Sequence, residues 1–276
     1  MPRRAALALA AAVALPAASA AQDLSTVAFS RQRTAEALLR VDLEYGGGTL
    51  QIAPGTDEML YSGRMRFDAE MFQPVVRYAN SRLEVGLDRG RLRGRNLRGQ
   101  SLDITLGTGV PMEVELRFGA AEADLELGGL RIRSARISTG ASNTALRFSE
   151  PNPEACQSFT VEVGAARFEA TGLGNLNSER LTVSGGVGEV ILDFTGTLRA
   201  DMIADIDMGL GALTLRVPRS LGVRVHKGGI LTGFDSQGLV RQGNEYVSPG
   251  WANAARKLTI HLDAALGSIR VAWVDG

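Results

Sequence analysis

The chain has 276 residues with 30 basic and 30 acidic side chains, so its formal charge at pH 7 is zero. This balance excludes proteins that are drawn to nucleic acid or anionic lipid by overall charge. Aromatic residues make up 5% of the chain and glycine contributes 33 residues. This composition suits a repeat fold with tight turns better than a carbohydrate groove lined with aromatic rings.

Residues 1–20 have the three parts of a secretory signal peptide. Arg3 and Arg4 give a positive start, residues 5–15 are apolar, and residues 18–20 read Ala-Ser-Ala, a small-x-small cleavage site. The apolar run is too short to cross a bilayer, and no later stretch is long and apolar enough to do so. Removing this segment takes two basic residues and no acidic one, which leaves 256 residues with a formal charge of −2. The sequence thus predicts a periplasmic or secreted protein without a transmembrane segment after signal cleavage.

Residues 21–99 are predicted to form an N-terminal domain. It holds one unit centred on Gly46 and irregular strands around residues 59–67, 75–78 and 83–87, where apolar residues recur between turn signals. At its end, five arginines alternate with apolar or small residues: Arg89, Arg91, Arg93, Arg95 and Arg98. Such a guanidinium row suits the phosphate or uronate groups of an envelope polymer. The alternative is a charged edge strand or loop that resists aggregation.

A unit of roughly 22 residues repeats through the predicted C-terminal domain, residues 100–276. Each unit has a central glycine with alternating apolar residues on both sides, as in Leu181 and Val183 before Gly186, and Val190 and Leu192 after it. The central glycines are Gly119, Gly140, Gly164, Gly186 and Gly209, and Gly46 and Ala265 fit as the centres of two more units. Period-two alternation inside a fixed longer period predicts an all-β fold, a parallel β-solenoid of short coils with capped ends. Its handedness is left open.

Two further features belong to this repeat. Seven residues after the central glycine, opposite charges recur in neighbouring units, as in Glu126 with Arg147 and Asp193 with Arg216. We expect these residues to form exposed pairs that favour the correct register of the coils. The repeat is interrupted at residues 218–257, where prolines and glycines punctuate short strands. This excursion is either a functional insertion or a cap over one end of the stack, and we expect a cap.

Several segments resemble a known family of bacterial envelope proteins. LYSGRMRFDAEMFQPVVRYANSRLEVGL at residues 60–87 resembles the N-terminal toast-rack domain. GAAEADLELGGL, STGASNTALRFSEPNP, GVGEVILDFTG, MGLGALTLRVP and AALGSIRVAW resemble the all-β repeats of the same group. They are also similar to the C-terminal domain of the cell-wall-active antibiotics response proteins. The resemblance implies a toast-rack fold in the cell envelope, and its membrane-bound members imply regulation of an envelope-stress histidine kinase.

Four polar residues of the last two units form a candidate metal site. They occupy equivalent positions before the centres of their units: Asp205, Asp207, His261 and Asp263. If the closing coil stacks directly on the preceding one, Asp205 lies beside His261 and Asp207 beside Asp263. Three carboxylates and one imidazole are a donor set for a divalent cation, and the same groups form a pH-responsive pair in an alternative interpretation. The third interpretation is a set of solvated outward residues, which exposed aspartates usually are.

No recognised catalytic signature occurs in the chain. Nucleophile elbows, metalloprotease and phosphate-loop motifs are absent, and the G-x-G pairs are expected to be turn glycines. The single cysteine, Cys156, excludes an intrachain disulfide framework, and it lies away from the cleavage site and so offers no lipid anchor there.

The sequence therefore predicts an exported, non-catalytic envelope module that binds a protein partner or a surface polymer. It needs no resident cofactor, a divalent cation remaining an option, and its oligomeric state is open. The first alternative is an enzyme acting on acidic polysaccharide, which requires Asp205, Asp207 and Asp263 to share a cleft with a basic residue. The second, suggested by the relatives, is an accessory protein of an envelope-stress sensor.

Overall fold

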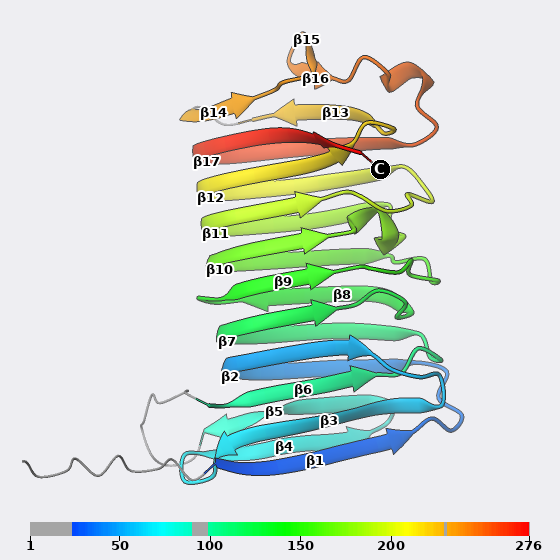
Figure 1. The fold of residues 1–276 in the computed structure, drawn as a ribbon, viewed down its shortest axis with the longest axis vertical. Helices are drawn as coiled ribbons and strands as arrows, with labels where there is room; N and C mark the ends of the chain where they lie inside the picture. The colour runs from blue at the N-terminus through cyan, green and yellow to red at the C-terminus, as the bar shows by residue number, and fades with distance from the viewer. Residues whose placement is uncertain (1–23, 90–98, 229–230, 276) are drawn as a thin grey trace, which may run out of the picture.

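The computed structural model describes residues 24–89, 99–228 and 231–275. In these residues the strands belong to one 17-stranded sheet, and they stack along a single long axis (Figure 1). The prediction of an all-β fold is confirmed. The expected irregular strands near residues 59–67, 75–78 and 83–87 are also present.

In chain order the strands are β1 (Leu24–Gln32), β2 (Leu39–Pro54), β3 (Met59–Asp68), β4 (Phe72–Ala79), β5 (Arg82–Arg89), β6 (Ser101–Leu106), β7 (Met112–Glu126), β8 (Ile132–Thr139), β9 (Asn143–Arg147), β10 (Ser158–Thr171), β11 (Arg180–Asp193), β12 (Met202–Pro218), β13 (Gly222–Lys227), β14 (Leu231–Asp235), β15 (Val240–Gln242), β16 (Glu245–Val247) and β17 (Lys257–Val274). Two short 3-10 helices, η1 (Leu173–Leu176) and η2 (Trp251–Asn253), lie in connecting loops.

The long strands in the middle of the stack bend at their central glycines, so that their two halves face each other. The first half of β10 pairs in parallel with β8, and its second half pairs in parallel with β9. We call the halves before the bend the first wall and the halves after it the second wall. Figure 1 shows the bends along one edge of the stack and the connecting loops along the other.

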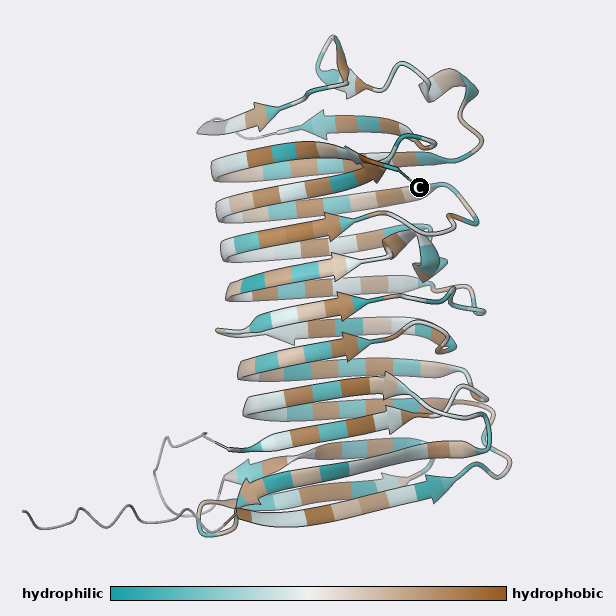
Figure 2. Cartoon of the chain, viewed as in Figure 1, coloured by the Kyte–Doolittle hydropathy of each residue, from teal (hydrophilic) through white to brown (hydrophobic). Residues whose placement is uncertain are grey.

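Successive units pair in the register that the glycine spacing predicts. On the first wall, Val161 lies opposite Val183, Val183 opposite Ile206, and Ile206 opposite Leu262. These side chains are buried between the walls, and apolar and polar residues alternate along the strands (Figure 2). Strand alternation therefore sends one set of side chains into a continuous core and the other set to the outside.

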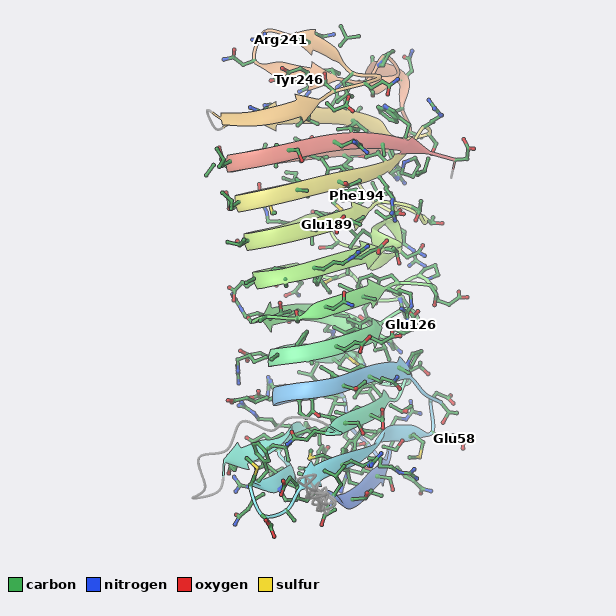
Figure 3. All side chains as sticks on the ribbon, turned by 60° about the vertical axis from the view of Figure 1, so that its left-hand side comes forward. Glu58, Glu126, Glu189, Phe194, Arg241 and Tyr246 are labelled. Carbon is green, nitrogen blue, oxygen red and sulfur yellow. The ribbon has the colours of Figure 1, made fainter. Side chains whose placement is uncertain are left out.

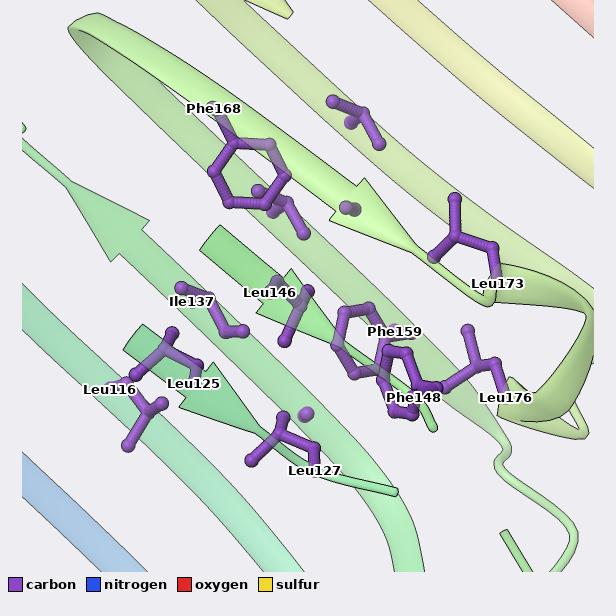
Figure 4. Packing of buried hydrophobic residues seen from close by; sticks show 14 of the residues in the cluster. Leu116, Leu125, Leu127, Ile137, Leu146, Phe148, Phe159, Phe168, Leu173 and Leu176 are labelled. Carbon is purple, nitrogen blue, oxygen red and sulfur yellow. The ribbon is translucent and has the colours of Figure 1, made fainter. Parts of the chain in front are cut away.

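The core is filled by aliphatic side chains and a few aromatic rings (Figure 4). Phe148 and Phe159 lie within it, with ring centroids 5.5 Å apart in an edge-to-face arrangement. Leu116, Leu125 and Ile137 belong to the same cluster and are buried. One hydrophobic cluster extends from β2 to β17, so the stack has a single core along its length.

Glycine is required at most of the centres because each bend lies directly on the bend of the preceding unit. A Cβ atom on Gly119 would lie 2.4 Å from the carbonyl oxygen of Gly46, and one on Gly209 would lie 2.5 Å from that of Gly186. A second row of glycines follows two residues later. Gly211 has φ +142°, and its Cβ would lie 1.9 Å from the carbonyl oxygen of Gly188. The G-x-G pairs therefore let the coils approach each other closely.

Spatial order departs from chain order at both ends of the stack. β2 lies between β7 on one side and β5 and β6 on the other, because β3 to β6 fold beneath it as an excursion. β6 also pairs with β3, so the sheet continues across the predicted domain boundary at residues 99 and 100. The parallel pairing ends here, since β1–β3, β3–β6 and β4–β5 are antiparallel.

The opposite end is built in the same way. β17 inserts between β12 and the excursion, because it pairs in parallel with β12 on one side and with β13 and β14 on the other. β13 is covered in turn by antiparallel β16 and β15. The indole Nε1 of Trp273 donates a hydrogen bond to the carbonyl oxygen of Gln237 at 2.7 Å. The described residues within 218–257 thus lie over this end of the stack, as a cap would.

A buried carboxylate organises the N-terminal end. The Glu36 side chain is only 6% exposed. It accepts hydrogen bonds from the Thr34 amide at 2.7 Å, the Thr34 hydroxyl at 3.0 Å and the Tyr78 hydroxyl at 3.2 Å. Burial alone would raise the pKa of Glu36, but these hydrogen bonds outweigh it and lower the pKa to about 2.

The stability contributed by Glu36 is expected to depend on pH. Because its pKa is lowered in the folded state, the contribution is complete above the unfolded pKa of about 4.5 and is lost as pH falls towards 2. We expect Glu36→Gln to cost about 2 kcal/mol at pH 7, a typical value for hydrogen bonds to a charged group. Melting temperatures of both proteins between pH 7 and pH 2 should converge as the pH falls. A difference that stays constant with pH would contradict this assignment.

Candidate functional site

The candidate metal residues lie in two neighbouring rows on the outside of the first wall. The closing strand β17 stacks directly on β12, with Asp205 opposite His261 and Asp207 opposite Asp263. His261 Nδ1 lies 2.8 Å from one carboxylate oxygen of Asp205. The other oxygen of Asp205 accepts a hydrogen bond from Arg180. The predicted neighbours are therefore in place, and Asp205 is already engaged on both sides.

The second histidine of the chain extends the row that contains His261. His226 on β13 lies opposite His261, with ring centroids 5.0 Å apart. Its Nδ1 lies 3.5 Å from Glu245 on β16. Asp205, His261, His226 and Glu245 thus form a row across four strands, with an acid at each end. The proximity of the two histidines could not be predicted from the sequence, because no local signal shows that β13 pairs with β17.

The two rows do not converge on one point. Adjacent strands are about 4.8 Å apart, and residues two positions apart along a strand are separated by about 6.8 Å. In the part of the chain that the structure describes, no group of three or more His, Cys, Asp or Glu side chains is arranged to hold a metal ion. A site for a divalent cation at Asp205, Asp207, His261 and Asp263 therefore stays a prediction.

The thermal melt of the protein with and without Ca²⁺, Mg²⁺ and Zn²⁺ tests the metal site. From this geometry we expect no measurable rise in melting temperature, because a ligand stabilises the fold only if it binds the folded state. The double variant Asp205→Ala/Asp263→Ala should respond to the ions as the unaltered protein does. A metal-dependent rise that disappears in the double variant would establish the site and contradict this expectation.

The predicted anion site falls largely outside the described residues. Arg89 is the last residue of β5. The other four arginines, Arg91, Arg93, Arg95 and Arg98, lie within residues 90–98, outside the described ranges. Recognition of phosphate or uronate by this run therefore stays a prediction.

A shallow groove of about 810 Å³ runs along the bend on the first wall, and we call it the corner groove. It crosses β8, β10, β11, β12 and β17. One bank carries hydroxyl and carboxylate groups in a single register row, Ser138, Glu162, Ser184, Asp207 and Asp263. The floor lies at the centres of the units, Gly164, Gly186, Gly209 and Ala265. Figure 3 turns the edge with the bends towards the viewer.

The corner groove does not have the composition of a polysaccharide-cleaving site. Of the four candidate residues, only Asp207 and Asp263 line it, and no arginine, lysine or histidine is among its described lining residues. Asp205 has its basic partner, Arg180, outside the groove. The cleft shared by three aspartates and a basic residue, which the enzyme interpretation requires, is not formed by the described residues.

The thiol of Cys156 is also a poor nucleophile. Its side chain is 4% exposed, in the loop before β10. Burial raises the pKa of the Cys156 thiol to about 11, against a smaller opposing effect of its contacts with Ser178 and Ser158. The thiol is therefore protonated at neutral pH, and only the thiolate reacts readily.

Elsewhere on the walls, the opposite charges seven residues after the central glycines pair across neighbouring units as predicted, with one difference. Arg147 lies 3.7 Å from Glu126 and also binds Asp124. Arg216, however, bonds mainly to Glu169 at 2.8 Å, two strands away, and lies 3.9 Å from Asp193. Its side chain thus crosses β11, where Asp193 is only 9% exposed. The expectation that Asp193 is exposed is wrong for this reason.

The family described as the N-terminal domain of toast_rack matches residues 19–169. No curated protein matches the chain. Among solved structures, a protein from Clostridium sporogenes ATCC 15579 proposed to act in cell adhesion is 18% identical, with a TM-score of 0.46, covering 91% of this chain and 100% of its own. A proposed adhesin from Bacteroides fragilis NCTC 9343 is 14% identical, with a TM-score of 0.45 and coverage of 91% and 98%.

Such distant similarities to solved structures carry no functional argument. In the described residues, no helix has the length and apolarity needed to span a bilayer. The family match is stronger evidence, because it spans more than half of the chain. It contains the segment at residues 60–87 that suggested the resemblance, and it extends beyond residue 99 into the repeats. The chain therefore belongs to the toast-rack family.

Proposed function

We propose that this protein is an exported, non-catalytic module of the cell envelope that binds a protein partner or a surface polymer. In this proposal the stack is a parallel β-solenoid whose rigid walls present the binding surface. The observation that carries it is the arrangement of the polar side chains. They lie on extended outer walls, where many already pair with each other, as Arg136 does with Glu162 and Arg180 with Asp205.

The outer walls are better suited to binding a partner than to catalysing a reaction. Catalysis by acid and base needs groups that converge on one reacting bond, whereas the charges here follow rows that run along the stack. A regular charged surface of this kind gives specificity and register to an extended partner. The family membership supports a place in the envelope, and the signal-like residues 1–20 support export to the periplasm or beyond.

The two alternatives are weaker. An enzyme acting on acidic polysaccharide is disfavoured by the corner groove, whose described lining residues include acids but no basic group. A role as an accessory of an envelope-stress sensor is a special case of binding a protein partner, and it is suggested only by the resemblance to membrane-bound relatives.

Co-sedimentation tests this proposal. The purified protein is mixed with cell-wall and membrane fragments of the organism that produces it, and each pellet is analysed at low and high salt. We expect the protein to sediment with envelope fragments, to be released by salt, and to produce no new reducing ends from acidic polysaccharides. Absence from every envelope pellet, or release of oligosaccharide products, would contradict the proposal.

A further inference from the structure

We propose that the corner groove binds an extended peptide segment in which basic and apolar side chains alternate. This inference rests on the proposed binding function and names the kind of partner that the groove fits. Three observations carry it: the mostly glycine floor, the acidic bank and an apolar row just beyond the floor.

The floor exists because three of its four central residues, all except Ala265, have no side chain. Cβ atoms on Gly164 and Gly186 would each lie 2.9 Å from a carbonyl oxygen of the coil beneath, so close stacking requires glycine there. The same absence of side chains leaves a trough between the row before the glycines and the row after them. The groove is therefore a direct consequence of the repeat.

Two carboxylates of the acidic bank have no cationic partner among the described residues. Asp207 and Asp263 lie directly opposite each other on β12 and β17, and both are exposed. Like charges in this arrangement repel. Among the described residues, neither carboxylate has a hydrogen bond or ion pair, and no basic side chain lines the groove. A lysine or arginine of a ligand would relieve this repulsion.

An apolar row follows the floor along the bend, one residue beyond the residues that line the groove. Val187, Leu210 and Leu266 each directly follow the centre of their unit, and they lie opposite one another on β11, β12 and β17. They are 52%, 45% and 46% exposed and account for three of the four large exposed hydrophobic residues in the described ranges. A contiguous exposed row of this kind marks a binding surface more often than scattered residues do.

The chemistry of the two sides favours an extended peptide. Successive side chains of an extended chain point in opposite directions, so alternating basic and apolar residues would reach the acidic bank and the apolar row at the same time. The five strands span about 19 Å, which about six extended residues cover. No aromatic ring lines the groove, whereas sugar sites usually stack their rings on aromatic side chains. A cationic polysaccharide is thus the less suitable ligand.

Fluorescence anisotropy with a labelled peptide of alternating lysine and leucine tests the inference. The comparison peptides have the same composition in two blocks, and glutamate in place of lysine. We expect the alternating peptide to bind at least about tenfold more tightly than either, and its affinity to fall with added salt. Equal binding of the block peptide would contradict recognition by alternating side chains.

Variants assign the binding to the groove. Asp207→Asn/Asp263→Asn removes the acidic bank with little change of shape, and Val187→Ser/Leu210→Ser removes part of the apolar row. Each should weaken binding by about tenfold or more. The matched control Glu58→Gln/Glu122→Gln removes two exposed carboxylates outside the groove and should bind as the unaltered protein does. Circular dichroism verifies that each variant is folded.

Two results would overturn the inference. One is unchanged peptide affinity in Asp207→Asn/Asp263→Asn. The other is an oligomer of glucosamine, a cationic sugar, that binds in the groove when the alternating peptide does not. Co-sedimentation with envelope fragments is measured separately, so its persistence in these cases would leave the proposed function standing while the peptide assignment fails.

Discussion

Leu192→Asp is expected to unfold the protein or make it insoluble. Leu192 is 1% exposed in the core, and on β11 it lies opposite Ala170 and Leu215, which are also buried. An aspartate there would place an unpaired carboxylate among apolar side chains, and the loss of Leu packing alone costs about 2–5 kcal/mol. Together these two costs amount to a large part of the roughly 5–15 kcal/mol by which a typical domain is stable. The yield of soluble protein and a urea melt measure the effect.

The matched control introduces the same residue on the outside of a neighbouring strand. Thr214 on β12 is half-buried on the second wall and lies opposite Arg270. Thr214→Asp should change the unfolding free energy by less than about 1 kcal/mol, because a carboxylate on the outside of the wall beside a guanidinium is nearly neutral in energy. Equal effects of the two variants would mean that the assignment of inward and outward residues is wrong.

Gly211→Ala is expected to lower the stability by about 3 kcal/mol or more, from backbone strain and a steric clash together. Gly211 has φ +142°, and an added Cβ would lie 1.9 Å from the carbonyl oxygen of Gly188, in the coil beneath. Neither the backbone of β12 nor that of β11 can move without disturbing its own pairing. The melting temperature should fall by several degrees for each kcal/mol lost.

Gly46→Ala is the control for this effect. Gly46 also lies at the centre of a bend, but an added Cβ would have no atom within 4 Å. This variant should melt within a few degrees of the unaltered protein, because substitutions that create no clash or strain have small effects. If Gly211→Ala and Gly46→Ala melt alike, close stacking of the bends is not what requires glycine.

The repeat could be predicted because it depends on local patterns. Alternation around Gly186 and Gly209 shows which residues face inward, and equal spacing aligns one coil on the next. The stacking of Asp205 beside His261 follows from this spacing alone. The resemblance to the toast-rack family predicted a toast-rack fold, and the family match supports that prediction.

The two ends could not be predicted, because their pairings join residues distant in sequence. No pattern in β2 shows that β3 to β6 will fold beneath it, or that β7 will pair with its other edge. The antiparallel pairs there have no counterpart in the repeat. For the same reason the proximity of His226 to His261 was not apparent, since it depends on where the excursion returns.

In the candidate site, two features could not be predicted from the sequence pattern: the burial of Asp193 and the corner groove. The recurrence of opposite charges predicted that Asp193 lies beside Arg216. It could not show that Arg216 reaches past Asp193 to Glu169 and helps to bury Asp193. The corner groove was missed because it is defined by absent side chains. The sequence marks Gly164, Gly186 and Gly209 as turn residues, and only the stacked strands reveal that they form the floor of a groove beside a row of acids and hydroxyls.

Photo-crosslinking from defined positions tests most directly whether the protein acts by binding through its outer surface. A photoreactive residue is placed in turn at Thr182 on the first wall, Thr214 on the second wall and Ser184 in the corner groove, and each protein is illuminated with envelope fragments. We predict covalent adducts with an envelope component from at least one of these positions, suppressed by high salt. Sedimentation with the envelope without an adduct from any outward position would contradict a binding surface on the walls.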